Sequence, residues 1–221
     1  MKSILSIICN KKVKNSLILL FLLFIYISIS AISYANTVSS DIKDSVFRLH
    51  VIANSDSTED QNLKYIVRDK LVEYMNSLCK DIQSRDEAIQ ISKNHKDEFL
   101  NIAKNTVLEN GYNYDVSIDI GNFEFPTKNY GDISLPAGNY DALRVKIGKA
   151  EGRNWWCVMF PPLCFVNITS GIVPEESKEL IKEDLTDDEY SIITKDESAD
   201  IQFKFSLLEW LQNNNILTAK K

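Results

Sequence analysis

Histidine and cysteine are scarce in this chain of 221 residues, which contains two histidines and four cysteines. A cysteine nucleophile needs a base beside it, most often a histidine. Of the two histidines, His95 falls on the apolar stripe of a predicted helix, which favours a structural role. The scarcity therefore argues against cysteine catalysis at Cys157.

A basic patch is also lacking. The first 35 residues carry four lysines and no acid, so the remainder of the chain has a net charge of −10. A nucleic-acid-binding surface would require clustered Lys and Arg, so this class of function is excluded. The acids concentrate in Ile168–Asp200, which holds eleven of them against three lysines and is interpreted as a solvated face.

One apolar run, Leu17–Ile32, contains no charged residue and follows a basic stretch of Lys11, Lys12 and Lys14. As a helix it would span about 24 Å, less than the roughly 30 Å hydrocarbon core of a bilayer. Ser33 and Ala35 place small residues where a signal peptidase reads them. We predict a signal peptide over 1–35, cleaved after Ala35, followed by a linker over 36–45. An uncleaved anchor is the alternative.

Hydrophobic periodicity predicts an α+β domain over 46–167. Val46–Ala53 alternates as a strand with His50 on its outer face. A capping box at Ser57 and Thr58 starts a helix that carries an apolar stripe to Leu78. A second helix is predicted over Asp86–Glu109, with both helices on one face of the sheet. From Tyr114 onward the period is two, which predicts a mostly antiparallel sheet. The remainder, 168–221, is predicted as an acidic segment that is partly helical around Glu175–Leu185, followed by a short strand from Ile201 that runs into a C-terminal helix.

The segment Arg153–Asn167 is dense in aromatics and prolines, and it predicts a fixed hairpin. Trp155 and Trp156 should point to opposite faces of its strand, one into the core and one exposed or covered by the C-terminal part. If the chain is exported, Cys157 and Cys164 are well placed to close the hairpin as a disulfide. Cys79 is interpreted as a small buried apolar residue.

Polar residues cluster where the first strand meets its helix, namely Asn54, Ser55, Asp56 and Asp60. They form either a recognition edge together with His50 or only a helix cap. Their alternating oxygens resemble a calcium loop, but Glu59 and Tyr65 stand where its glycine and distal glutamate belong. We therefore predict no metal and no cofactor. Tyr130 and Tyr140 flank turns and are expected to line the same surface.

Four sequence blocks resemble the stage II sporulation protein R family of endospore-forming bacteria: FRLHVIANSDSTEDQ (47–61), LKYIVRD (63–69), LPAGNYDALRVKIG (135–148) and NWWCVMFPPLCFV (154–166). The resemblance implies a non-enzymatic protein made in the forespore and exported towards the space between the septal membranes. It also implies a partner, a membrane-embedded aspartic protease that processes the precursor of a mother-cell sigma factor.

The predicted function is therefore activation of that protease by an exported ligand. The surface expected to bind the partner comprises His50, Asn54, Ser55, Asp56, Asp60, Tyr130, Tyr140, Trp155 and Trp156. One alternative is a secreted hydrolase of cell-wall polymer with Asp56 and Asp60 as acid and base. Another is a membrane-tethered structural protein, which would need Leu17–Ile32 to be retained.

Overall fold

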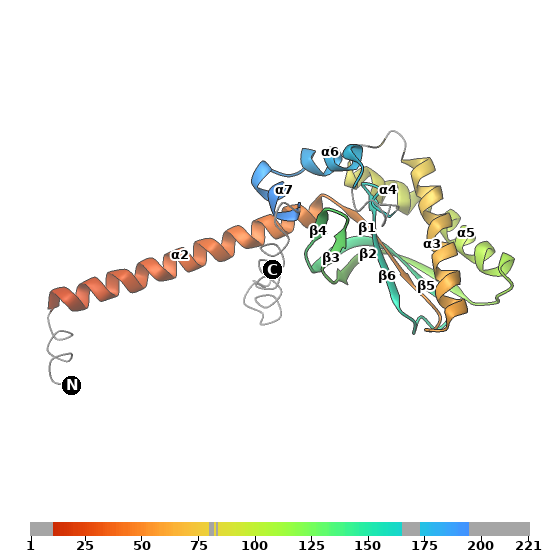
Figure 1. Cartoon of the computed structure of the whole chain (residues 1–221), viewed down its shortest axis with the longest axis horizontal. Coiled ribbons are helices and arrows are strands. Elements are labelled where there is room, and N and C mark those ends of the chain that lie inside the picture. The colour runs from red at the N-terminus through yellow and green to blue at the C-terminus, as the bar shows by residue number, and fades with distance from the viewer. Residues whose placement is uncertain (1–10, 80–81, 83, 165–172, 195–221) are drawn as a thin grey trace.

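The computed structural model describes residues 11–79, 82, 84–164 and 173–194 (Figure 1). Its sheet has four strands in the order β2-β5-β1-β6. Strand β1 (Phe47–Ile52) is parallel to β5 (Gly138–Ile147) and antiparallel to β6 (Asn154–Phe160), while β2 (Val116–Phe125) is antiparallel to β5. The sheet is mostly antiparallel and the fold is α+β, as predicted.

Helices α3 (Thr58–Leu78) and α5 (Lys96–Glu109) lie along one side of this sheet (Figure 1). Helix α3 starts at Ser57, whose side chain accepts a hydrogen bond from the backbone N–H of Asp60. Such a cap satisfies one of the free N–H groups in the first turn. The side chains that fill the space between these helices and the sheet are fully buried and include Leu49, Val51, Leu143, Val145, Leu63, Val67, Phe99 and Ala103.

The second predicted helix is two helices, so the single span Asp86–Glu109 was wrong. Helix α4 (Arg85–Asn94) ends at His95, and α5 begins at Lys96. The backbone of His95, with φ −104° and ψ 22°, leaves the helical region and turns the chain. Its ring Nδ1 lies 3.0 Å from the hydroxyl of Tyr74 on α3, which fixes the break against the neighbouring helix.

The opposite face of the sheet is buried at one end by a two-stranded ribbon of β3 (Lys128–Tyr130) and β4 (Ile133–Leu135). Beneath it lie Arg48, Phe125 and Tyr140, all nearly inaccessible. Since both faces of β1 are covered here, its alternation of apolar and polar residues does not separate core from solvent. The outer-face position predicted for His50 was therefore wrong, because its side chain is buried.

The predicted linker 36–45 is mostly helical. Helix α2 (Lys11–Asp44) runs without a break from the apolar run into the domain, where Val38 and Ile42 are buried. Arg85, at the start of α4, pairs with Asp44 at 3.2 Å and also with Asp141 on β5. By length and composition α2 is able to cross a membrane, and its apolar part is exposed in the structure.

Two short helices, α6 (Glu175–Glu183) and α7 (Asp187–Ile193), form the described part of the acidic segment. The helix predicted around 175–185 is confirmed, whereas α7 was read only as exposed chain. Lys178 on α6 pairs with Asp132 at 2.7 Å, and Thr194 bridges to Ile133, so both helices hold the β3–β4 ribbon. The strand and helix predicted beyond 200 lie outside the described residues.

Candidate partner-binding surface

The turn between β1 and α3 is joined to the loop between β5 and β6 by side-chain hydrogen bonds. The Oδ1 of Asn54 accepts from the backbone N–H of Lys149 at 3.0 Å. The Oδ1 of Asp56 accepts from the backbone N–H of Arg153 at 2.6 Å. These bonds hold two chain segments almost a hundred residues apart in sequence as one rigid rim.

Two glycines permit this close approach. A side chain at Gly152 would collide with the backbone carbonyl of Ser55, and one at Gly148 would collide with the amide of Asn54. Gly148 also has φ +57°, a conformation that side chains with a Cβ disfavour. The rim therefore depends on small residues in the β5–β6 loop as much as on the polar residues of the turn.

Asp60 lies at the centre of this network and is 4% exposed. Its carboxylate accepts hydrogen bonds from Ser55 Oγ at 2.5 Å and from Asn54 Nδ2 at 2.8 Å. Burial raises the pKa of Asp60, but these hydrogen bonds outweigh burial and the pKa is lowered overall. A general acid needs a raised pKa, so Asp60 does not fit the acid of the hydrolase alternative.

Beside Asp60, a lysine is buried without a carboxylate bonded to it among the described residues. Lys64 Nζ donates to Gln61 Oε1 at 2.5 Å and to the carbonyl of Arg153 at 3.0 Å. Burial, with the nearby charges of Arg153 and Arg68, lowers the pKa of Lys64 to about 8. The burial of Lys64 is not predictable from the sequence, because a lysine on a polar stretch of helix has the same pattern as an exposed one.

Trp155 and Trp156 point to opposite faces of β6, as predicted. Trp155 packs against Tyr65 edge-on and under the guanidinium of Arg68, whose carbon lies 4.3 Å from the ring centroid. Both tryptophans are half-buried, so neither is a fully exposed anchor nor a fully buried core residue. On this side, Tyr65 is the ring that solvent reaches most freely.

On the other face, Trp156 stacks on His50 with ring centroids 3.7 Å apart. The Nε2 of His50 lies 2.9 Å from Asn154 Oδ1, while its Nδ1 is buried without a partner among the described residues. Burial lowers the pKa of His50 to about 4, the bond to Asn154 opposes this, and Arg144, Lys146 and Arg48 lower it further. The imidazole is therefore neutral at pH 7.

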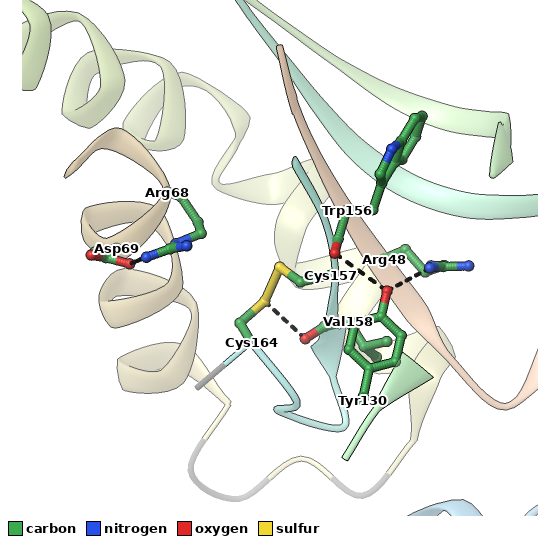
Figure 2. Close-up of a disulfide and its surroundings, with 8 residues drawn as sticks. All are labelled: Arg48, Arg68, Asp69, Tyr130, Trp156, Cys157, Val158 and Cys164. Atoms are coloured by element: carbon green, nitrogen blue, oxygen red, sulfur yellow. Dashed lines mark hydrogen bonds and ion pairs between the residues drawn. A yellow bond between two sulfur atoms is a disulfide. The ribbon is translucent and has the colours of Figure 1, made fainter. Parts of the chain in front are cut away.

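Next to His50 on β1, the guanidinium of Arg48 is buried among aromatic rings. Its carbon lies 4.1 Å from the ring centroid of Phe125 and 4.5 Å from that of Tyr140. Arg48 Nη2 donates to the hydroxyl of Tyr130 at 2.6 Å, and that hydroxyl donates to the carbonyl of Trp156 (Figure 2). Tyr130 and Tyr140 are thus buried, and their predicted exposure at the surface was wrong.

The hairpin after β6 is closed by a disulfide between Cys157 and Cys164, with Cα atoms 5.2 Å apart (Figure 2). That separation is within the usual range for this bond. The backbone N–H of Leu163 bonds the carbonyl of Val158 at 3.2 Å, and the Phe160–Pro161 peptide is cis. The predicted staple is confirmed, and Cys79 remains a half-buried free thiol at the end of α3.

Taken together, the structure brings Asn54, Ser55, Asp56 and Asp60 into one rim, and His50 with Trp156 into a separate cluster. Trp155 lies on the helical side of the sheet, so the nine predicted residues do not form one surface. Among the described residues, no group of three or more His, Cys, Asp or Glu is arranged to hold a metal ion.

The sequence of this domain is similar to that of a known protein family. Residues 43–170 match the family model described as stage II sporulation protein R. The chain belongs to the stage II sporulation protein R family. A curated relative from Bacillus subtilis (strain 168), "Stage II sporulation protein R", is 36% identical over 184 residues, which cover 78% of this chain and 82% of the relative. No solved structure matches the chain.

Membership in the stage II sporulation protein R family makes this chain a sporulation protein. The matched region begins at the buried end of α2 and includes the whole sheet, the rim and the disulfide hairpin. The rim, the cluster of His50 with Trp156 and the disulfide hairpin therefore belong to the part of the chain that the family shares.

Proposed function

We propose that the chain is exported from the forespore and that its folded domain activates a membrane-embedded aspartic protease, which then processes a sigma factor precursor. The observation that carries the proposal is a disulfide-closed α+β domain that follows a basic and apolar N-terminal helix, in a member of a sporulation family. A disulfide is typical of proteins that fold in an oxidising compartment outside the cytosol.

The proposed role is that of a ligand rather than an enzyme. In the rim, the carboxylates of Asp56 and Asp60 are used to hold the chain together, which supports a binding scaffold over an acid–base pair. Activation then requires that the domain bind the active state of the protease better than its resting state. A preference of about 5- to 150-fold is typical of such coupling.

Co-expression tests this proposal directly. The protease, the sigma factor precursor and the full chain are produced together, and cleavage of the precursor is followed by immunoblot with and without the chain. We expect cleavage to depend on the chain. Equal cleavage in its absence would contradict the proposal. Unchanged activation by an Asp56→Asn variant with normal thermal stability would further argue against the hydrolase alternative.

A further inference from the structure

The face of the sheet opposite α3 and α5 is only partly covered. Tyr130 and the β3–β4 ribbon bury the end that holds Arg48 and Tyr140. Towards the other end the same face carries Asp119, Arg144 and Lys146, whose side chains are 47%, 26% and 37% exposed. The register places Arg144 beside both Asp119 and His50, so these residues form one continuous strip across the sheet.

Positive charge exceeds negative charge on this strip. Arg144 and Lys146 both pair with the same carboxylate, Asp119, at 3.2 and 3.5 Å. Arg48, two residues before His50 on β1, is buried beneath the β3–β4 ribbon and adds no exposed charge to the strip. A cationic strip on a chain with a net charge of −6 is a local reversal of sign, which favours an anionic occupant.

Arg144 has a donor that is still unused. Its Nε is buried and has no hydrogen-bond partner among the described residues. Buried polar groups without partners are rare in folded proteins. A strip with more positive than negative charge and an unpaired guanidinium N–H favours a carboxylate as its occupant.

Aromatic surface accompanies the charges. The guanidinium carbon of Arg144 lies 3.9 Å from the ring centroid of Phe123, and Trp156 lies on the far side of His50. Both rings are half-exposed. Four strands at a spacing of about 4.8 Å make the strip roughly 14 Å wide, enough for a short extended segment to cross. Arg and aromatic residues are also the types that dominate binding energy at interfaces.

The position of the strip favours a protein over a lipid surface. Gly138, at the start of β5, lies against Lys43 of α2, whereas Lys146 is eight residues further along the strand. At about 3.3 Å per residue the strip is roughly 26 Å from the point where α2 enters the domain. In Figure 1, the end of the sheet where β5 finishes and β6 starts is directed away from α2. A membrane that held α2 would therefore not meet these cations.

We propose that this cationic strip, in which Arg144 and Lys146 are flanked by Phe123 and Trp156, docks an acidic segment of the partner protein. Carboxylates of that segment pair with Arg144 and Lys146 in competition with Asp119, and its apolar side chains pack on Phe123 and Trp156. The inference rests on the proposed function, in which the partner is the membrane-embedded protease.

The test uses the full chain co-expressed with the protease and the precursor. We expect the double variant Arg144→Gln/Lys146→Gln to lower precursor cleavage about tenfold at limiting activator, because charges at an interface govern the association rate. Arg144→Lys retains the charge and should preserve most of the activity. The matched control is Lys70→Gln/Lys93→Gln, which removes two exposed lysines from α3 and α4 and should change nothing.

Asp119→Asn gives the opposite expectation. It removes the competing carboxylate from the strip, so cleavage at limiting activator should rise severalfold, an outcome that misfolding cannot produce. Wild-type activity combined with an unaffected Arg144→Gln/Lys146→Gln variant would overturn the docking strip and leave the proposed function standing. Failure of the wild-type chain to activate would instead reject the proposed function.

A photo-crosslinking residue at Lys146 identifies the occupant. An adduct within an acidic segment of the protease supports the inference. An adduct with a second copy of this chain or with lipid, or no adduct while cleavage proceeds, would contradict it. The same residue placed at Lys93, on the helical side, serves as the control position.

Discussion

At the scale of single residues, the sheet buries a positive charge, Arg48, that has no ion pair within the part of the chain that the structure describes. Arg48 relies on the rings of Phe125 and Tyr140 and on the hydroxyl of Tyr130. Cation–π contacts of this kind contribute about 2 kcal/mol when they are shielded from water. The neutral ring of His50 fits this environment because a further charge would be repelled by Arg48, Arg144 and Lys146.

Because the pKa of His50 is lowered in the folded state, we expect the protein to lose stability in mild acid. Its pKa is about 4 in the folded state and 6.5 as a free side chain, so the folded state binds the proton more weakly. The free energy of unfolding should therefore be intact above pH 6.5 and fall by about 3 kcal/mol as the pH drops from 6.5 to 4. Urea titrations across this range measure the fall.

The variant His50→Gln should be less stable than the wild type at pH 7 and should show a flatter pH profile between 6.5 and 4. His95→Gln removes the other histidine and serves as the control, which should retain the wild-type slope. An equal slope for the His50→Gln variant and the wild type would show that other groups cause the acid sensitivity.

A substitution at Gly152 tests how closely the two chain segments of the rim approach each other. Gly152→Ala would push a methyl group into the carbonyl of Ser55, and overpacking of this kind costs about 1–3 kcal/mol. The matched control is Gly121→Ala on β2, where the new methyl would make only ordinary contact with Phe123. Thermal unfolding should show a lower Tm for the Gly152→Ala variant alone, and similar values for both would contradict the close approach.

At the scale of elements, the hairpin after β6 combines a strand, a disulfide and a cis proline in a short span. Val158 connects these parts, because its carbonyl accepts from Leu163 and its side chain is fully buried. The disulfide loop is short, so the bond adds most by holding this return segment against the edge of the sheet.

Removing the disulfide should lower stability by roughly 2–3 kcal/mol, the chain-entropy value for a loop of this size. In a chain of this length that corresponds to a fall in Tm of about 5–8 °C. Cys157→Ala/Cys164→Ala and reduction of the wild type should give the same shift by calorimetry. A wild-type Tm that does not respond to reductant would contradict the role of the bond.

The sequence predicted most of these elements and few of their contacts. Period-two alternation located β1, β2 and β5, the run of aromatics and prolines located β6, and the capping residue Ser57 located the start of α3. The break at His95 was missed because the apolar stripe continues across it. Burial of Arg48 and Lys64 was missed because it depends on the β3–β4 ribbon and the β5–β6 loop, which come from distant parts of the chain. For the same reason, the charges that alternate on β5 were seen only as the polar side of a strand.

At the scale of the whole molecule, α2 belongs to the folded domain at its C-terminal end. Val38 and Ile42 are 5% and 1% exposed, and the helix end is held by Arg85. The predicted cleavage site after Ala35 precedes these buried residues. The apolar part of α2 can therefore be removed while the buried residues of the helix stay in the fold.

Two truncations test this division. A chain that lacks 1–35 should keep the stability of the domain. A chain that lacks 1–44 also loses Val38 and Ile42, each worth about 1.5–3 kcal/mol when buried, so it should be roughly 3–6 kcal/mol less stable. Urea unfolding of both proteins gives the comparison, and equal midpoints would show that 36–44 contributes nothing to the fold.

The unbroken helix has a consequence for distance across the septum. Beyond the apolar run, Ser33–Asp44 extends α2 by about 18 Å before the domain begins. Under the proposed function, a retained α2 acts as a stiff stalk that holds the domain at a fixed height above its own membrane. Such a signal works only where the two membranes lie within a few nanometres of each other. Cleavage after Ala35 would remove that spacing requirement and let the domain diffuse to its partner.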